Sequence, residues 1–139
     1  MTSDAKWEPS PCLGVRDVRK GAEYLQTHLG FTINSIESPA SETDPVYAIV
    51  SRSGCELHLQ IRRRPLWSGA RQEIELDAYI RVPDVDAVWA DFSARGAQIL
   101  RPPCDQAYGM RDCVVAGPEG YCLAFGSALP KPGGPPEDR

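Results

Sequence analysis

The two histidines are the first side chains in this sequence to consider for chemistry. His58 lies in a predicted strand over residues 55–61, where Leu57 and Leu59 fall on one face and His58 on the other. On a strand, a single histidine is either a metal ligand or, more commonly, a hydrogen-bonded residue that lines a pocket. His28 lies near the end of a predicted helix, where the helix dipole favours a positive charge, and we expect it at the surface.

The cysteines and the remaining motifs point to no covalent chemistry. The five cysteines are odd in number, lie mostly in predicted strands and form no close CxxC pair, so we expect buried free thiols. Cys104 is the one cysteine expected in a loop, and no sequence neighbour activates it. No Ser-His-Asp arrangement stands out, and the Gly-rich loops that bind phosphate are absent.

Aromatic residues offer a different kind of site. Trp67 lies on a polar segment in mid-chain, Tyr47 and Tyr79 on predicted strands, and Tyr108 in a predicted loop. Aromatic walls with a few polar groups suit a planar or amphipathic organic molecule. Core packing is the competing explanation, and for Trp67 and Tyr108 a ligand or dimer contact is an equal alternative.

Composition excludes several classes of function. The net charge of −4 and the pI of about 5.1 argue against a dedicated nucleic-acid binder. The short basic run at residues 62–64 is best interpreted as a solvated loop, with an arginine that reaches an anionic ligand as the minor alternative. No apolar stretch has the length of a membrane span and residues 1–11 lack a signal-peptide core, so we expect a cytoplasmic protein.

The chain contains an internal duplication. The segment Val15–Val18 (VRDV) matches Val82–Val85 (VPDV) 67 residues later, and Leu57–Leu59 (LHL) matches Leu123–Phe125 (LAF) 66 residues later. Each half is too small to bury a core alone, so the two halves must share one. The cleft between them is the natural place for a ligand.

Periodicity predicts the same element order, βαβββ, in both halves. We expect an N-terminal extension over 1–10, a first module over 11–61, a connector over 62–73, a second module over 74–127 and a disordered tail over 128–139. The predicted helices cover 19–29, after a cap at Asp17 and before Gly30, and 84–95. The predicted strands cover 11–15, 31–35, 46–51, 55–61, 74–82, 98–100, 110–115 and 121–126, with loops over 36–44 and 101–109. The predicted fold class is α+β, with a curved mixed sheet around a concave cleft and the helices outside.

Several segments recur in the order and spacing of a known family. They are Leu13–Val18, Tyr24–Leu25, His28–Phe31, Gly54–Leu59, Val82–Ala87, Tyr108–Asp112 and Pro118–Tyr121. This pattern resembles the vicinal oxygen chelate superfamily, which includes glyoxalase I, extradiol dioxygenases, fosfomycin-resistance enzymes and bleomycin-resistance binding proteins. The bleomycin-resistance branch is the most similar.

The resemblance implies four metal-facing positions. Each half contributes one position from its first strand and one from its last strand. These positions are Ser10, His58, Asp77 and Ala124 in this sequence, and only His58 and Asp77 could hold a divalent ion. Two protein ligands rarely retain a catalytic metal, so we expect no metal and no cofactor. A register shift that brings in Glu56 or Glu75 is the remaining alternative.

The resulting prediction is a dimeric, antibiotic-like small-molecule binding protein of the bleomycin-resistance type, which sequesters its ligand and breaks no bond. Its expected ligand-binding residues are His58, Trp67, Tyr47, Asp77, Tyr79, Tyr108 and Arg111. Asp77 would accept a cationic ligand or pair with Arg81 or Arg111, and Arg111 would reach the cleft or neutralise Asp112. The alternatives are a metal-dependent lyase, isomerase or dioxygenase with an atypical site built on His58 and Asp77, and a scaffold protein with a vestigial cleft.

Overall fold

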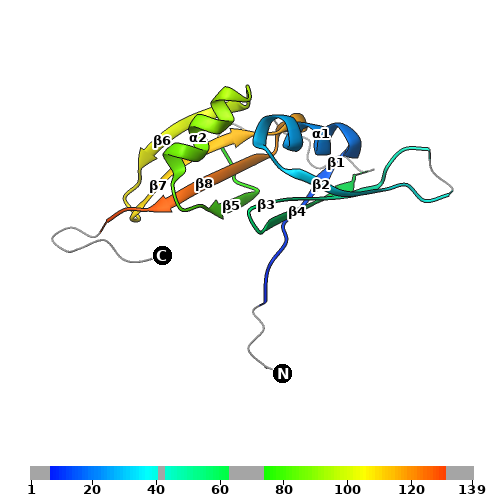
Figure 1. Cartoon of the computed structure of the whole chain (residues 1–139), viewed down its shortest axis with the longest axis horizontal. Helices are drawn as coiled ribbons and strands as arrows, with labels where there is room; N and C mark the ends of the chain where they lie inside the picture. Colours follow the sequence, from blue (N-terminus) through cyan, green and yellow to red (C-terminus); the bar gives the residue numbers. More distant parts are fainter. Residues whose placement is uncertain (1–6, 41–42, 63–73, 131–139) are drawn as a thin grey trace.

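The computed structural model describes residues 7–40, 43–62 and 74–130 (Figure 1). The first module contains β1 (Cys12–Val15), α1 (Val18–Leu29), β2 (Thr32–Glu37), β3 (Tyr47–Arg52) and β4 (Cys55–Ile61). The second contains β5 (Ala78–Arg81), α2 (Val85–Ala94), β6 (Gln98–Asp105), β7 (Met110–Ala116), the 3₁₀ turn η1 (Pro118–Gly120) and β8 (Cys122–Ala128). Trp67, most of the predicted connector and most of the predicted tail lie outside the described residues.

Each module forms its own four-stranded mixed sheet, so the predicted α+β fold with two βαβββ units is confirmed. The strand orders are β1-β4-β3-β2 and β5-β8-β7-β6, in which β1 and β5 are parallel to their neighbours and the other pairs are antiparallel. The two helices lie on the same side of the molecule, above the sheets in Figure 1. None of the described helices is long and apolar enough to cross a membrane.

The local signals in the two halves produce matching structures. Asp17 and Asp84 cap the two helices with their side chains, and Gly30 ends α1 in the left-handed conformation. Both last hairpins contain two consecutive residues with positive φ, Ser53-Gly54 in the first module and Glu119-Gly120 in the second. The first turn has only these two residues, whereas the second is longer and includes η1, so the duplication preserves the hairpin but not the length of its turn.

One core joins the two modules, as the duplication predicts. Leu25 and Leu57 of the first module belong to the same buried cluster as Phe92 and Phe125 of the second. His28 is partly exposed, as predicted for a surface position, and its Nδ1 also lies 2.6 Å from the carbonyl oxygen of Arg95 at the end of α2.

Charged side chains also hold the modules together. Arg52 Nη1 at the end of β3 donates to the Leu29 carbonyl at 2.6 Å and to the Asp91 carboxylate of α2 at 2.9 Å. In the other direction, the Glu119 carboxylate accepts from the backbone N–H groups of Arg16 and Asp17. These contacts fix the position of one sheet relative to the other.

The second half differs from the prediction in its strands. The predicted loop over 101–109 is wrong in its first part, since β6 runs from Gln98 to Asp105 through Pro102 and Pro103. Proline is tolerated there because β6 is an edge strand with two register shifts. The strand β5 is shorter than predicted, since it begins only at Ala78. In the first half, β2 extends to Glu37, beyond its predicted end.

Candidate functional site

Each sheet packs one face against its helix, and we call the other face the open face. On the first sheet this face is partly exposed, whereas on the second sheet its strand residues are mostly buried beneath neighbouring side chains. Leu57 and Leu59 of β4 are buried on the α1 side, so Glu56 and His58 project from the open face. On β7, Cys113 belongs to the core on the α2 side, and Asp112 projects from the open face of the second sheet. The site thus consists of two open faces, one from each module.

A chain of hydrogen bonds runs across the first open face. Tyr47 Oη lies 2.5 Å from His58 Nδ1, and His58 Nε2 lies 2.8 Å from Glu56 Oε1. The Glu56 carboxylate can only accept, so Nε2 carries a ring proton and donates to it. In the neutral tautomer with this proton, Nδ1 accepts from the Tyr47 phenol, whose pKa is raised by burial and by nearby groups, first among them Cys12. Ser10 Oγ adds a longer bond of 3.4 Å to the same Glu56 oxygen.

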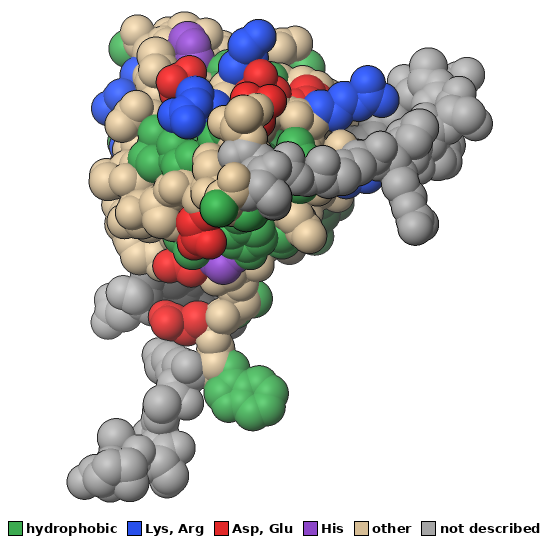
Figure 2. All heavy atoms as spheres, turned by 90° about the vertical axis from the view of Figure 1, so that its right-hand side faces the viewer, with side chains coloured by type: hydrophobic (Ala, Val, Ile, Leu, Met, Phe, Trp, Pro, Cys, Tyr) green, Lys and Arg blue, Asp and Glu red, His purple; other side chains and the backbone are tan. Residues whose placement is uncertain are grey.

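Beside this chain lies a groove of about 460 Å³, which we call the acidic groove. It is lined by the N-terminal segment 8–11, by residues 54–56 at the start of β4, and by Tyr79 and Ile80 of β5. Glu8 and Glu56 supply its carboxylates. Figure 2 shows acidic side chains gathered with a histidine toward the N-terminal end of the molecule, away from most of the basic ones. The groove is suited to a ligand with a positive charge.

A buried carboxylate organises the second open face. Asp112 is 0% exposed and accepts from Tyr79 Oη at 2.8 Å, Tyr108 Oη at 2.5 Å and Arg101 Nη2 at 2.6 Å. Gln106 Nε2 lies 3.2 Å from the same carboxylate. The residues Tyr79 and Tyr108 remain 37% and 63% exposed, so one buried anion holds two exposed tyrosines in position.

The network also sets the protonation states of its members. Burial disfavours the charge of Asp112, but the hydrogen bonds from its partners outweigh burial and hold its pKa below the usual range. The pKa of Tyr79 is raised by burial and by its bond to Asp112. The bond to Asp112 raises the pKa of Tyr108 as well. The carboxylate is therefore ionised and both phenols are protonated at neutral pH.

The other predicted site residues are placed differently. Arg111 donates to Asp86 of α2 and to Asp105, so it lies on the helix side of its sheet and away from the open face. It does not neutralise Asp112, because adjacent strand residues point to opposite faces. Asp77 accepts the backbone N–H of Cys122 at 2.9 Å, and no bond to Arg81 or Arg111 was found for it among the described residues.

Sequence reasoning missed Asp112 and Arg101 as members of the site. The alternation rule alone would have placed Asp112 opposite Arg111. Arg101 was hidden because it follows the predicted end of its strand, and the register shifts of β6 bring it to Asp112.

The described donor set does not fit the divalent metal that this fold class holds in enzymes. No group of three His, Cys, Asp or Glu side chains within 7–40, 43–62 and 74–130 could hold an ion. Of the four expected positions, Ala124 has no donor, and Asp77 is bonded to backbone. Both ring nitrogens of His58 lie in hydrogen bonds with Tyr47 and Glu56.

Comparison with known proteins gives the family. The sequence profile of the Glyoxalase/Bleomycin resistance protein/Dioxygenase superfamily matches residues 10–125. The chain belongs to this superfamily. No curated protein sequence matches it.

Several solved structures share the fold at low sequence identity. A bleomycin-binding protein complexed with bleomycin is 20% identical, with a TM-score of 0.69 over 88% of this chain and 98% of that chain. TioX from Micromonospora sp. ML1 is 21% identical, with a TM-score of 0.66 over 85% and 95%. A glyoxalase-related enzyme from Clostridium phytofermentans is 16% identical, with a TM-score of 0.71 over 93% and 100%. At these identities, the similarity shows the fold alone.

Proposed function

We propose that this superfamily member binds a planar, positively charged organic molecule between its open faces and sequesters it without conversion. The observation that carries the proposal is the state of His58, whose ring nitrogens face Tyr47 and Glu56 while its counterpart in the second module is Ala124. This arrangement suits ligand recognition and leaves the fold's metal positions without a ligand set.

Charge recognition is assigned to Glu56 and Glu8 rather than to Asp77. Both glutamates line the acidic groove, whereas Asp77 is engaged with the backbone of β8. Arg111, which would oppose a cation, is paired with acidic residues on the other side of its sheet. Tyr47, Tyr79, Tyr108 and Trp67 are proposed to supply aromatic surface for the planar part of the ligand.

We also propose a homodimer in which a second copy covers the open faces. The first strand of each module, β1 or β5, lies at an edge of its sheet. Around β5 the apolar side chains of Ile74, Leu76 and Tyr79 are 48%, 47% and 37% exposed, which is typical of a surface that is buried on association. Light scattering of the purified chain should give twice the mass of 15.2 kDa.

The binding proposal is tested by titration with two probes, proflavine as a planar cation and bleomycin as the ligand of a structural relative. At least one should bind, and mass spectrometry should recover it intact after prolonged incubation. Glu56→Gln should weaken proflavine binding about tenfold, because it removes the charge and keeps the shape. Glu23→Gln, on the exposed side of α1, is the matched control and should leave the affinity unchanged.

Conversion of either probe would contradict sequestration. Equal effects of the two glutamate substitutions would contradict the acidic groove as the place of charge recognition.

A further inference from the structure

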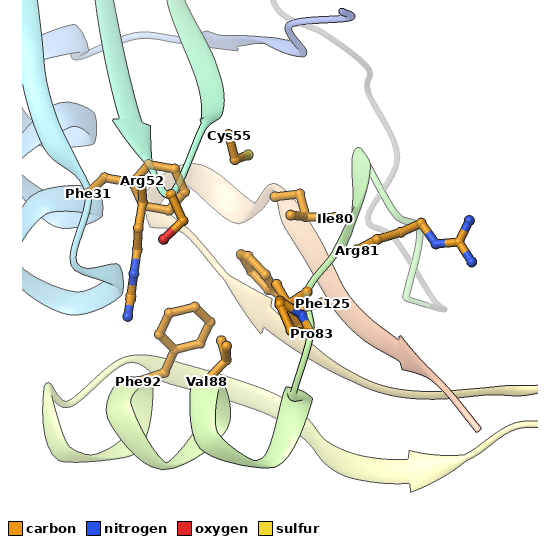
Figure 3. Close-up of a pocket in the computed structure, with 11 residues that line it drawn as sticks. Phe31, Arg52, Cys55, Ile80, Arg81, Pro83, Val88, Phe92 and Phe125 are labelled. Carbon is orange, nitrogen blue, oxygen red and sulfur yellow. The ribbon is translucent and has the colours of Figure 1, made fainter. Parts of the chain in front are cut away.

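A second cavity, which we call the interface pocket, lies where the two modules meet. It has a volume of about 140 Å³ (Figure 3). Phe31 comes from the first module, Val88 and Phe92 from α2, and Ile80 and Phe125 from the second sheet. The figure shows these apolar side chains turned toward a common space, and the long side chain of Arg81 turned away from it.

The walls of the interface pocket offer little to a charged or strongly polar ligand. Phe31, Phe92 and Phe125 are each at most 3% exposed, and the rings of Phe92 and Phe125 meet edge to face at 4.9 Å. Among the described lining residues, Arg52 is the arginine whose side chain borders the space, and its Nη1 already donates to Asp91 and to a backbone carbonyl. A polar group placed there would lose hydrogen bonds to water and gain few in return.

We propose that the interface pocket is a second binding site that takes one uncharged aromatic or alicyclic ring. Apolar cavities of about 150 Å³ accept benzene, so the volume found here matches a single ring. The interface pocket is partly open to solvent, so a bound ring would displace water from its apolar walls. The site is distinct from the acidic groove, but Cys55 and Ile80 line both. A ring in the pocket therefore contacts two residues that also face the groove.

The test is ligand-observed NMR with the intact chain, using benzene and cyclohexane as neutral probes and benzoate and benzylammonium as charged probes. The neutral rings should bind at least tenfold more tightly than the charged ones. Val88→Phe should fill the pocket and weaken benzene binding at least tenfold. Ala87→Phe, at the exposed neighbouring position of α2, adds the same ring outside the pocket and should leave benzene binding unchanged.

Val88→Ala covers the case in which Val88→Phe does not fold. The enlarged pocket should bind naphthalene at least tenfold more tightly relative to benzene than the original pocket does. Absence of benzene binding, equal binding of the charged probes, or an unchanged naphthalene-to-benzene ratio would each overturn the proposal. Glu56→Gln should weaken proflavine binding and leave benzene binding unchanged. The proposal for the acidic groove and the proposal for the interface pocket can therefore fail independently.

Discussion

The open faces of the two modules have matching backbones and different side chains. Cys12 pairs with His58 on the first sheet as Tyr79 pairs with Ala124 on the second, so His58 and Ala124 occupy equivalent positions. His58 lies in a half-exposed polar chain, whereas Ala124 belongs to a small buried apolar cluster with Val114 and Cys122. The centre of one face is polar and the centre of the other is apolar.

A second pair of equivalent positions, Tyr47 and Asp112, also carries side chains of different chemistry. Tyr47 lies beside Gln60 on the first sheet as Asp112 lies beside Gly126 on the second. Tyr47 is a donor to a neighbour on the surface, and Asp112 is a buried acceptor for two tyrosines and an arginine. The comparison indicates that the duplication fixed the positions, while substitution placed a hydrogen-bonded polar chain on the first face and a buried carboxylate that holds two tyrosine rings on the second.

The largest expected effect comes from Asp112→Ala, which removes the carboxylate shared by Arg101 Nη2 and two phenols and leaves Arg101 only its bonds to a backbone carbonyl and to Cys104. We expect the free energy of unfolding to fall by about 3 kcal/mol, the scale for breaking a buried ion pair from one side. Urea denaturation measures the change. Asp86→Ala removes the exposed aspartate partner of Arg111 and should have a much smaller effect. Similar losses of stability for the two variants would show that the buried carboxylate of Asp112 does not stabilise the second sheet through its partners.

Exchanging the central residues tests whether the faces are interchangeable. Ala124→His overpacks the apolar cluster and buries an imidazole without a partner, so it should destabilise the fold by about 2 kcal/mol. His58→Ala opens space on a half-exposed face and should destabilise it by about 1 kcal/mol. Thermal unfolding of both variants gives the order. If Ala124→His were neutral, the two centres would not differ as described.

Gly126 allows Tyr79 to lie across the second sheet. A Cβ at this glycine would overlap the Tyr79 hydroxyl and approach the Asp112 Cβ at 3.0 Å. Gly126→Ala should displace the Tyr79 ring and cost about 1 kcal/mol for the lost bond to Asp112. In a Tyr79→Ala background the same substitution should cost clearly less, because only the close approach to the Asp112 Cβ remains. Additive effects in this double-mutant cycle would show that the ring does not depend on the glycine.

The smallest expected effect is a loss of folding stability at acidic pH. Because the pKa of Asp112 is lowered in the folded state, its contribution to stability is complete above the unfolded value of about 4. The contribution is lost as the pH falls below that value toward the folded pKa. Stability of the original chain should therefore decrease more steeply between pH 4 and pH 2 than that of Asp112→Asn. Parallel pH profiles would contradict the assignment.

Local sequence signals were sufficient for most of the fold, because caps, turns and strand alternation act over a few residues. Asp17, Gly30 and the hairpin at Ser53-Gly54 behave as their residue types require. β6 was predicted too short, because its prolines indicate a loop unless the strand is known to lie at an edge. Edge position is a property of the whole sheet and cannot be read from residues 101–105.

The site was harder to predict, because its contacts cross between elements far apart in the sequence. His58, Tyr47 and Tyr79 lie on open faces, as strand alternation allows. Arg111 was misplaced, since its partner Asp86 comes from a helix 25 residues earlier. The interface pocket depends on the docking of the two modules, for which the sequence offers no local pattern.

The central claim is that this fold retains its cleft without the side chains that hold a metal. Titration calorimetry of the chelator-treated chain with Zn²⁺, Ni²⁺, Mn²⁺ and Fe²⁺ tests it most directly. We expect no uptake of one ion per chain that depends on His58, and proflavine binding that is the same with and without added metal. Binding of one ion per chain that is lost in His58→Ala would contradict the account and favour metal-dependent catalysis.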